Sequence, residues 1–348
     1  MMIKSMKAVQ YLGPGELDLR QVPVPQAAEG ELIVRVRAAT TCGTDVKTFL
    51  RGHPKFKPPS PFGHEFAGDV VEVGAGVDQF QVGMRVTANV FAPCGSCFYC
   101  KMGQSNLCED MIYNLGAYAE YLRIPTPIVR YNTFELPDDF PYKQAAILEP
   151  LVSVVHAQAR AAIQPGERVV ILGAGGAIGL MHLQMAVRSG ASQVIAVDLS
   201  QVRLEIAAQL GATTNIQAPQ PDLLDEILDL TEGRGVDVVI ECAGKAETWL
   251  QAVELVRKGG RVVWFGGLPG DATVALDTYK IHYGELTLLG THGGTPLDAL
   301  RAFELLTSGV INSRALISDE VGLDQVQSAL SRMARGEVVK VAIDPSLP

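Results

Sequence analysis

The chain has 348 residues, of which 47% are hydrophobic and 19% charged, and its formal net charge is −9. This composition predicts a packed globular protein of about two domains and argues against extended disorder. An acidic protein has no general attraction to nucleic acid or anionic membranes, so we expect a small molecule or another copy of the chain as partner. No apolar run approaches the length of ~20 residues that a membrane-spanning helix needs, and we find no secretory signal. Six cysteines are too few for a disulfide scaffold in a chain of this length, which suits a reducing cytoplasm.

The first 150 residues are predicted to form short strands interrupted by glycine and proline. Residues 31–37 alternate between apolar and polar side chains, which is typical of a half-buried strand. Shorter runs follow at 67–73 and 82–90, and the prolines of 54–61 indicate a loop. We interpret this part of the chain as a small, irregular β domain.

From residue 153 onward the pattern changes to alternating helices and strands. Residues 153–163 are rich in alanine and predict a helix, and the apolar run 168–172 is typical of a parallel strand covered on both faces. Further strands are predicted at 193–197, 236–240, 260–265 and 286–290. This alternation predicts an α/β fold with a doubly wound parallel sheet. Helices at 297–308 and 323–335 and a strand at 338–343 complete the chain.

The clearest chemical motif is a cluster of four cysteines, Cys94, Cys97, Cys100 and Cys108. Four thiolates at this spacing can surround one tetrahedral Zn²⁺ and leave no open position, which predicts a structural zinc site. An iron–sulfur cluster is the weaker alternative, because the spacing differs from that of ferredoxins.

A second set of metal-binding side chains is spread along the sequence and consists of Cys42, His64, Glu65 and Glu149. A catalytic zinc needs about three protein ligands and one position for water or substrate. One cysteine, one histidine and one carboxylate would serve, although their spacing alone does not establish a site.

The third motif is a strand, a glycine-rich turn and the start of a helix over residues 169–179. Such a turn binds a pyrophosphate through backbone N–H groups. The residues concerned are Gly173, Gly175, Gly176, Ala177, Ile178 and Gly179. The strict G-x-G-x-x-G spacing is not met. When the last glycine of the pattern is aligned with Gly179, either Gly173 or Gly175 is one glycine more than the pattern contains. Asp198 ends the next strand, where a carboxylate can accept a hydrogen bond from a ribose 2′-OH. Such a carboxylate repels a 2′-phosphate and therefore favours NAD over NADP. Arg203 follows on the next predicted helix and is a candidate neighbour of the adenosine.

These motifs, in this order, resemble the zinc-dependent medium-chain alcohol dehydrogenase family over essentially the whole chain. The resemblance rests on residues 42–45, 63–68, 116–121 and 148–151, together with the four cysteines. The pair Glu149-Pro150 is similar to the sorbitol (polyol) and threonine dehydrogenase branch of the family. Better-known alcohol dehydrogenases carry a second catalytic-zinc cysteine in place of Glu149.

The resemblance implies a GroES-like, β-rich catalytic domain and a Rossmann domain. The catalytic domain would comprise residues 1–152, with the structural zinc segment at about 91–110, and a return segment 292–348; the NAD-binding domain would comprise 153–291. Two zinc ions per chain, NAD, a small alcohol or polyol substrate, and a homodimer or homotetramer are implied.

The resemblance also implies roles for individual residues. Cys42 and His64 would be zinc ligands, and Glu65 and Glu149 either ligands or partners of the zinc-bound water. Thr44 would relay the substrate proton. Further cofactor contacts would come from Cys242 and Ala243 near the adenosine, from Phe265, Gly266, Gly267, Leu289, Gly290 and Thr291 around the nicotinamide, and from Lys340, a basic residue near the cofactor or site.

The substrate is the least determined part of this prediction. Lys47 stands where threonine dehydrogenases carry histidine, which argues against threonine as the substrate. The branch that the chain resembles implies a polyol or sugar derivative. An L-threonine 3-dehydrogenase or a simple alcohol dehydrogenase is the alternative within the family. A non-catalytic NAD-binding relative is disfavoured because Cys42 and His64 are present. Among the other histidines, His53 and then His292 are the best candidates for a substrate contact, whereas His182 is expected to be structural.

Overall fold

The computed structural model describes residues 5–53, 56–219 and 222–348. The chain forms two compact units, Met1–Val152 with Gly294–Pro348, and Ser153–Gly293. Within the described part of the chain, no helix is both long and apolar enough to cross a membrane. The loop predicted at 54–61 lies partly outside the described residues, and its last two residues form the short strand β4 (Ser60–Pro61).

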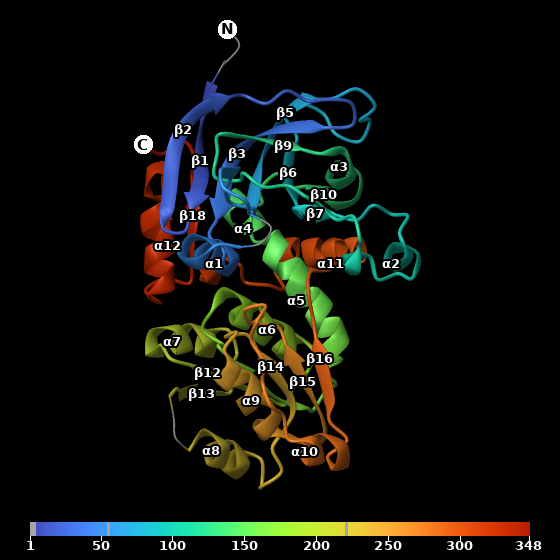
Figure 1. Ribbon diagram of the computed structural model, residues 1–348, viewed down its shortest axis with the longest axis vertical. Coiled ribbons are helices and arrows are strands. Elements are labelled where there is room, and N and C mark those ends of the chain that lie inside the picture. Colours follow the sequence, from blue (N-terminus) through green and yellow to red (C-terminus); the bar gives the residue numbers. More distant parts are fainter. Residues whose placement is uncertain (1–4, 54–55, 220–221) are drawn as a thin grey trace. The chain divides into compact units, whose positions relative to one another are not determined.

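The first unit is built on three sheets (Figure 1). In the largest sheet the order is β10-β6-β5-β3-β18-β17, and β9 also pairs with β3. Its strands are β3 (Leu32–Thr40), β5 (Phe66–Val73), β6 (Arg85–Ala88), β9 (Tyr121–Ile124), β10 (Thr133–Glu135), β17 (Ile317–Val321) and β18 (Lys340–Ile343). The smaller sheets consist of β1 (Ser5–Gly13) and β2 (Glu16–Pro23) with β4, and of β7 (Phe91–Ala92) with β8 (Ile112–Tyr113).

Strand β3 holds the centre of this unit. Its middle alternates as predicted, with Arg35 and Arg37 exposed between buried neighbours, but Ala38, Ala39 and Thr40 are all buried. The reason is that β5 and β18 flank this end, with Ala39 opposite Phe66 and Thr40 opposite Ala342. The last strand of the chain therefore completes the sheet that begins near residue 32.

Helices and short 3-10 turns connect and cover these strands. They are α1 (Gly43–Arg51), α2 (Phe98–Lys101), α3 (Thr126–Asn132), α4 (Tyr142–Ala145), α5 (Leu148–Ala161), α11 (Pro296–Thr307), α12 (Val326–Ala334), η1 (Ser105–Leu107), η2 (Arg314–Leu316) and η3 (Leu323–Gln325). Helix α5 begins five residues before the sequence predicts and continues into the second unit.

The second unit is a six-stranded parallel sheet in the order β13-β12-β11-β14-β15-β16. Its elements are β11 (Arg168–Leu172), α6 (Ala177–Arg188), β12 (Gln193–Asp198), α7 (Gln201–Gln209), β13 (Thr214–Gln217), α8 (Leu223–Leu230), β14 (Val236–Glu241), α9 (Ala246–Leu255), β15 (Val256–Trp264), α10 (Thr278–Tyr283) and β16 (Thr287–Gly290). The strand order reverses between β11 and β14, and ligands of such sheets bind beyond the carboxyl ends of the strands at this point. The doubly wound prediction is confirmed.

The glycine-rich turn after β11 differs in one respect from the sequence interpretation. Gly173 has a φ of 77°, and a Cβ on Gly175 would lie 2.5 Å from Cβ of Arg203, so neither of these glycines is dispensable. A Cβ on Gly179 would lie 2.4 Å from the carbonyl oxygen of Gly173. Gly176, at the N-cap of α6, has a φ of −75° and room for a Cβ. The extra residue of the turn is therefore accommodated at Gly176.

This difference predicts unequal effects for two alanine substitutions in one turn. Gly179→Ala should lower the free energy of unfolding by about 1–3 kcal/mol, because backbone atoms occupy the space the methyl group needs. Gly176→Ala should change it by less than about 1 kcal/mol, because its φ suits alanine but the N-cap position favours glycine. Urea unfolding of both variants checks this, and equal effects would contradict the close packing at Gly179.

Candidate metal and cofactor sites

Cys42 is placed by the start of helix α1. It is the N-cap residue, and its Sγ accepts a hydrogen bond from the backbone N–H of Thr44 at 3.5 Å. Asp45 Oδ2 accepts from the backbone N–H of Cys42 at 3.1 Å, which completes a reciprocal capping box. The cysteine and the aspartate are thus fixed relative to each other by the helix end. Thr44 is half-buried in the same turn.

His64 and Glu65 lie just before β5 and next to the end of β3. The backbone N–H of Thr40 donates to the carbonyl of Glu65 at 3.2 Å. One ligand atom each from Cys42, His64 and Glu65 lies within 4.8 Å of the others. The structure therefore brings together one sulfur, one nitrogen and one oxygen donor, as a catalytic zinc site requires.

Glu149, in the first turn of α5, approaches the same three residues. Its Oε2 lies 3.9 Å from Nε2 of His64. Burial raises the pKa of Glu149 to about 7, while His64 opposes this rise. The carboxyl is close enough to serve the site, although it is not among the three donors within 4.8 Å of one another.

Glu65 is held by a buried ion pair. Lys340, on β18, donates to both carboxylate oxygens at 2.8 and 2.5 Å and to the carbonyl of Thr41 at 2.6 Å. The hydroxyl of Thr40 also donates to Glu65. The lysine side chain is 1% exposed and that of Glu65 is fully buried. Lys340 was expected near the cofactor or the site, and the structure places it against a candidate metal ligand.

Asp45 connects three parts of the site. Its Oδ1 lies 2.9 Å from Nδ1 of His64, and its Oδ2 accepts from the hydroxyl of Tyr118 at 2.5 Å. A carboxylate beside one ring nitrogen of a histidine fixes the ring and directs the other nitrogen toward a metal. Burial, and then Asp45, raise the pKa of Tyr118 well above its usual value.

These groups bring several acidic side chains together in the protein interior. Asp45 and Glu65 are fully buried, and Cys42 and Glu149 stand beside them. Lys340 is the one lysine or arginine that is buried in the described part of the chain. Burial alone would lower the pKa of His64, but Asp45 and Cys42 outweigh it and raise this pKa well above its usual value. The site thus attracts positive charge, and the donor set suits a divalent zinc ion.

The four cysteines of the second candidate site converge as well. One sulfur from each lies within 4.8 Å of the other three. Sγ of Cys97 is 3.5 Å from that of Cys100 and 3.8 Å from that of Cys108. Zinc–sulfur bonds of about 2.3 Å in a tetrahedron separate the sulfurs by about 3.8 Å, so the four thiols fit one zinc ion.

The four thiols differ in how readily they ionise. Hydrogen bonds from the backbone and side chain of Ser96 lower the pKa of Cys94 to about 6. Burial, and then Cys97, raise the pKa of Cys100 to about 12. The thiolate is the form that binds zinc, so Cys94 is prepared for this role by its local hydrogen bonds.

The predicted cofactor residues follow the carboxyl ends of the strands in the second unit. Asp198 Oδ2 accepts from the backbone N–H of Gly175 at 2.9 Å, and its Oδ1 accepts from that of Ser200 at 3.0 Å. Both oxygens keep capacity for a further donor. Because the strands are parallel, the candidates after β11, β12, β14, β15 and β16 share one edge of the sheet.

The loop after β14 is tied to the segment after β15. Glu241 accepts from the N–H of Gly244 at 2.8 Å through its side chain, and from the N–H of Phe265 at 3.0 Å through its carbonyl. The adenosine and nicotinamide candidates Cys242, Ala243, Phe265 and Gly266 therefore belong to one connected loop pair. The ring of Phe265 lies edge-on to His182, 4.9 Å between centroids.

Sequence reasoning missed the contacts of Asp45 and Tyr118 beside the metal donors, and the buried contact of Gln158 with His182. The Cys-x-x-Asp pattern of a capping box could have indicated Asp45. His182 is buried, as its structural interpretation predicts, and burial lowers its pKa to about 3. Gln158 Nε2 lies 3.0 Å from its Nδ1. Nothing in the sequence spacing connects residues 158 and 182.

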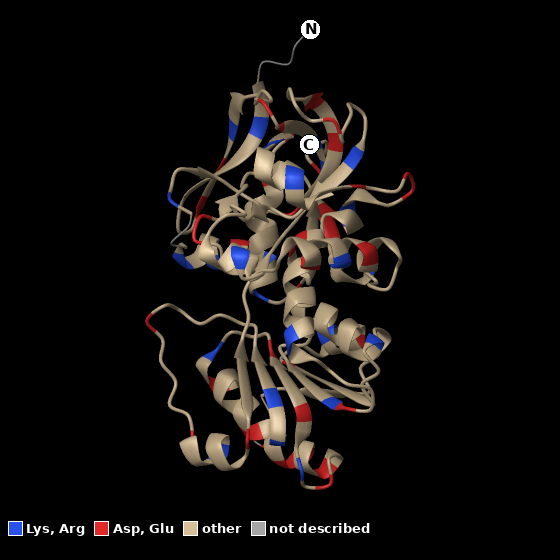
Figure 2. Cartoon of the chain, turned by 90° about the vertical axis from the view of Figure 1, so that its right-hand side faces the viewer, with Lys and Arg blue, Asp and Glu red and all other residues tan. Residues whose placement is uncertain are grey.

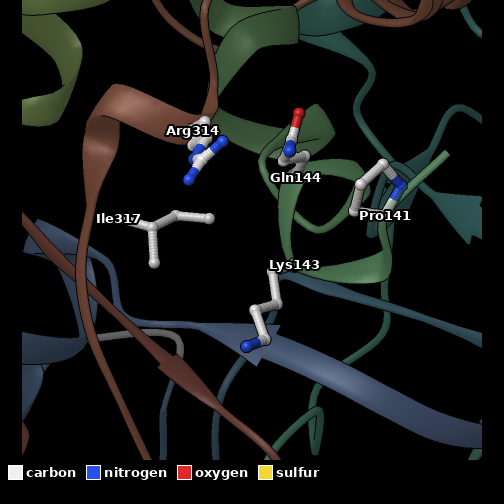
Figure 3. Close-up of a pocket in the computed structure, with 5 residues that line it drawn as sticks. All are labelled: Pro141, Lys143, Gln144, Arg314 and Ile317. Atoms are coloured by element: carbon white, nitrogen blue, oxygen red, sulfur yellow. The ribbon is translucent and has the colours of Figure 1, made fainter.

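A separate shallow hollow of about 290 Å³ lies in the first unit (Figure 3). It is lined by Pro141, Lys143, Gln144, Arg314 and Ile317. Lys143 pairs with Glu320, and Gln144 accepts a hydrogen bond from the hydroxyl of Ser313. None of the metal donors lines it, so the hollow is not part of the candidate metal sites.

Acidic and basic residues are interspersed along the chain in both units in the cartoon of Figure 2.

Comparisons with known proteins agree with this geometry. Residues 28–137 match the alcohol dehydrogenase GroES-like domain, and residues 177–308 match zinc-binding dehydrogenases. Sorbitol dehydrogenase of Bacillus subtilis is 34% identical, covering 99% of this chain and 98% of the relative. L-threonine 3-dehydrogenase of Bacillus licheniformis is also 34% identical, covering 95% and 97%.

A solved zinc-binding dehydrogenase of Sinorhizobium meliloti, with NADP bound, has a TM-score of 0.90 and 35% identity. The match covers 98% of this chain and 99% of the related chain. The fold and the donor clusters define a two-unit dehydrogenase with a GroES-like part and a Rossmann part. The chain belongs to the zinc-dependent alcohol dehydrogenase family, in the branch that contains sorbitol and threonine dehydrogenases.

The buried ion pair predicts a large effect for a substitution on the last strand. Lys340→Met should lower the free energy of unfolding by about 3–5 kcal/mol, because it leaves the Glu65 carboxylate buried without its cation. Lys143→Met, which breaks the solvent-exposed pair with Glu320, should cost less than about 1 kcal/mol. Chemical denaturation of both variants measures these losses. Similar losses would show that the buried pair contributes no more to the free energy of unfolding than the exposed pair.

Proposed function

We propose that the protein is a zinc- and NAD-dependent dehydrogenase that oxidises a secondary alcohol of the polyol or sugar class. The observation that carries this proposal is the convergence of Cys42, His64 and Glu65 beside Glu149, in a buried site rich in acidic side chains. On this proposal a second zinc ion lies among the four cysteines and has a structural role.

Cys42, His64 and one of the two glutamates would hold the catalytic zinc. Such an ion, when bound, polarises an alcohol oxygen and lowers the pKa of its hydroxyl group. Asp45 orients His64, and Lys340 holds Glu65 in a defined position. Thr44, half-buried in the same helical turn as Cys42, is the candidate to accept the substrate proton and pass it outward.

The nicotinamide cofactor would bind along the carboxyl edge of the parallel sheet. When bound, the nicotinamide ring accepts the hydride from the alcohol carbon. The turn Gly173–Gly179 offers backbone N–H groups for the pyrophosphate, and α6 begins directly behind it. Residues 263–267 and 289–291 would surround the nicotinamide, and Cys242, Ala243 and Arg203 the adenosine.

The charge of Asp198 favours NAD over NADP. A carboxylate accepts a hydrogen bond from a ribose 2′-OH and repels a 2′-phosphate. The related structure from Sinorhizobium meliloti was solved with NADP, so the two cofactors must be compared directly for this chain.

The substrate class follows from the branch of the family. The relatives include sorbitol and L-threonine dehydrogenases at equal identity, and Lys47 replaces the histidine expected for threonine. We therefore place polyols and sugar derivatives first, with threonine and simple alcohols as the alternatives. A cytoplasmic homodimer or homotetramer completes the proposal, and light scattering of the purified protein tests its assembly.

Removal of a zinc ligand should separate chemistry from nucleotide binding. Cys42→Ser and His64→Ala should each reduce kcat at least about 100-fold, because zinc supplies the polarisation of the alcohol. Binding of NAD, measured by calorimetry, should remain within a few-fold of wild type. His282→Ala is the matched control, since this exposed histidine belongs to neither cluster and is not among the proposed cofactor contacts. Most of the activity surviving in both variants would exclude the zinc mechanism.

Cofactor preference should depend on Asp198. The wild-type enzyme should show a higher kcat/KM with NAD than with NADP. Asp198→Asn keeps an oxygen that can accept from Gly175 but removes the charge, so the preference should fall at least about tenfold. A wild-type preference for NADP would overturn the assignment of the 2′-OH to Asp198.

The substrate class is tested by NAD reduction across polyols, sugars, amino alcohols and simple alcohols. We expect the highest kcat/KM with a polyol or sugar derivative. A higher value with threonine would favour the first alternative, and no turnover with any alcohol by the zinc-loaded protein would favour a non-catalytic role.

A further inference from the structure

The hydroxyl of Tyr118 is not a candidate metal ligand, but it is connected to the ligands through Asp45. It donates to Asp45 Oδ2 at 2.5 Å, and the next acceptor, the carbonyl of Thr40, lies 3.3 Å away. A phenol has one hydrogen to donate, so the short contact to Asp45 is the principal bond. Both side chains are fully buried.

The ring of Tyr118 is positioned by packing, independently of its hydroxyl. It lies edge-on to Phe62, with centroids 5.8 Å apart. It also covers Gly63, where a Cβ would come within 2.6 Å of the ring. A phenylalanine at position 118 would therefore keep these contacts and lose only those of the hydroxyl, the short bond to Asp45 and the longer contact with Thr40.

Asp45 connects Tyr118 to two candidate metal ligands. Its Oδ2, which accepts from Tyr118, also accepts from the backbone N–H of Cys42 at 3.1 Å. Its Oδ1 lies 2.9 Å from Nδ1 of His64. A shift of this carboxylate would therefore move a sulfur donor and a nitrogen donor together.

We propose that Tyr118 is a positioning residue that sets the zinc affinity of the Cys42–His64–Glu65 site by anchoring Asp45. The inference rests on the proposed function, because it takes zinc as the ion held by these three residues. Substitution of outer partners of metal ligands typically costs 10–100-fold in metal affinity. Because Tyr118 acts through Asp45, we expect an effect near the lower end, about tenfold.

The test is the rate of zinc release to a chromogenic chelator from the full-length, zinc-loaded protein. The four-cysteine site, which holds its zinc through four thiolates, provides a slow internal reference phase. Tyr118→Phe should accelerate the fast phase about tenfold and leave the slow phase unchanged. Tyr142→Phe is the matched control, because it removes a tyrosine–aspartate hydrogen bond, to Asp69, away from the metal donors. It should leave both phases unchanged.

A double-mutant cycle shows whether Tyr118 acts through Asp45. Asp45→Asn should accelerate the fast phase, and adding Tyr118→Phe should produce little further change. Full additivity would overturn the proposal, because Tyr118 would then act by another route. Should Tyr118→Phe fail to fold, 3-fluorotyrosine at position 118 replaces it as the variant. This more acidic phenol is a stronger donor and should slow the fast phase, whereas an unchanged rate would overturn the proposal.

Zinc content separates this inference from the function on which it rests. Wild-type protein that binds no zinc at the Cys42 site would contradict both. Wild-type protein with two zinc ions, and a Tyr118→Phe variant that releases both at the wild-type rates, would contradict only the role of Tyr118.

Discussion

The buried pair between Lys340 and Glu65 is the interaction on which the rest of the first unit depends. Charge is costly to bury, and the same region contains Asp45, Cys42 and Glu149. The cation comes from β18, far along the chain, which reaches the site because it pairs with the end of β3. The sheet and the charge balance of the site are therefore formed together, and neither is complete without the C-terminal strand.

The two donor clusters are chemically different, and this difference matches the roles proposed for them. Four thiols on a segment with short helical turns converge and can supply all four ligands of one zinc ion. Cys42, His64 and Glu65 come from the start of α1 and the approach to β5, and three donors leave a coordination position for an alcohol oxygen. Asp45 and Lys340 are buried partners of His64 and Glu65, and they hold in place a ligand set that leaves one position open. A zinc ion with a purely structural role would be expected to have four protein ligands.

Local patterns predicted much of this structure. The strand Arg168–Leu172 has the predicted bounds, because an unbroken apolar run suits a strand covered on both faces. Strand β13 was missed because Thr214, Asn215 and Gln217 give it no apolar pattern, and only its pairing with β12 makes it a strand. The metal donors were predicted from residue type and family resemblance. The contacts of these donors with their partners were not predicted, since a pair such as Lys340 and Glu65 joins residues that only the folded sheet brings together.

The central claim is that one chain holds two zinc ions in unlike surroundings. X-ray absorption spectroscopy of the zinc-loaded protein tests it most directly, because it counts sulfur neighbours per zinc. One site with four sulfurs and one with a single sulfur and three lighter donors predict an average of about 2.5 sulfurs per zinc ion, with two ions per chain. An average of about four sulfurs, with one zinc per chain, would show that the Cys42 site holds none and would contradict the account.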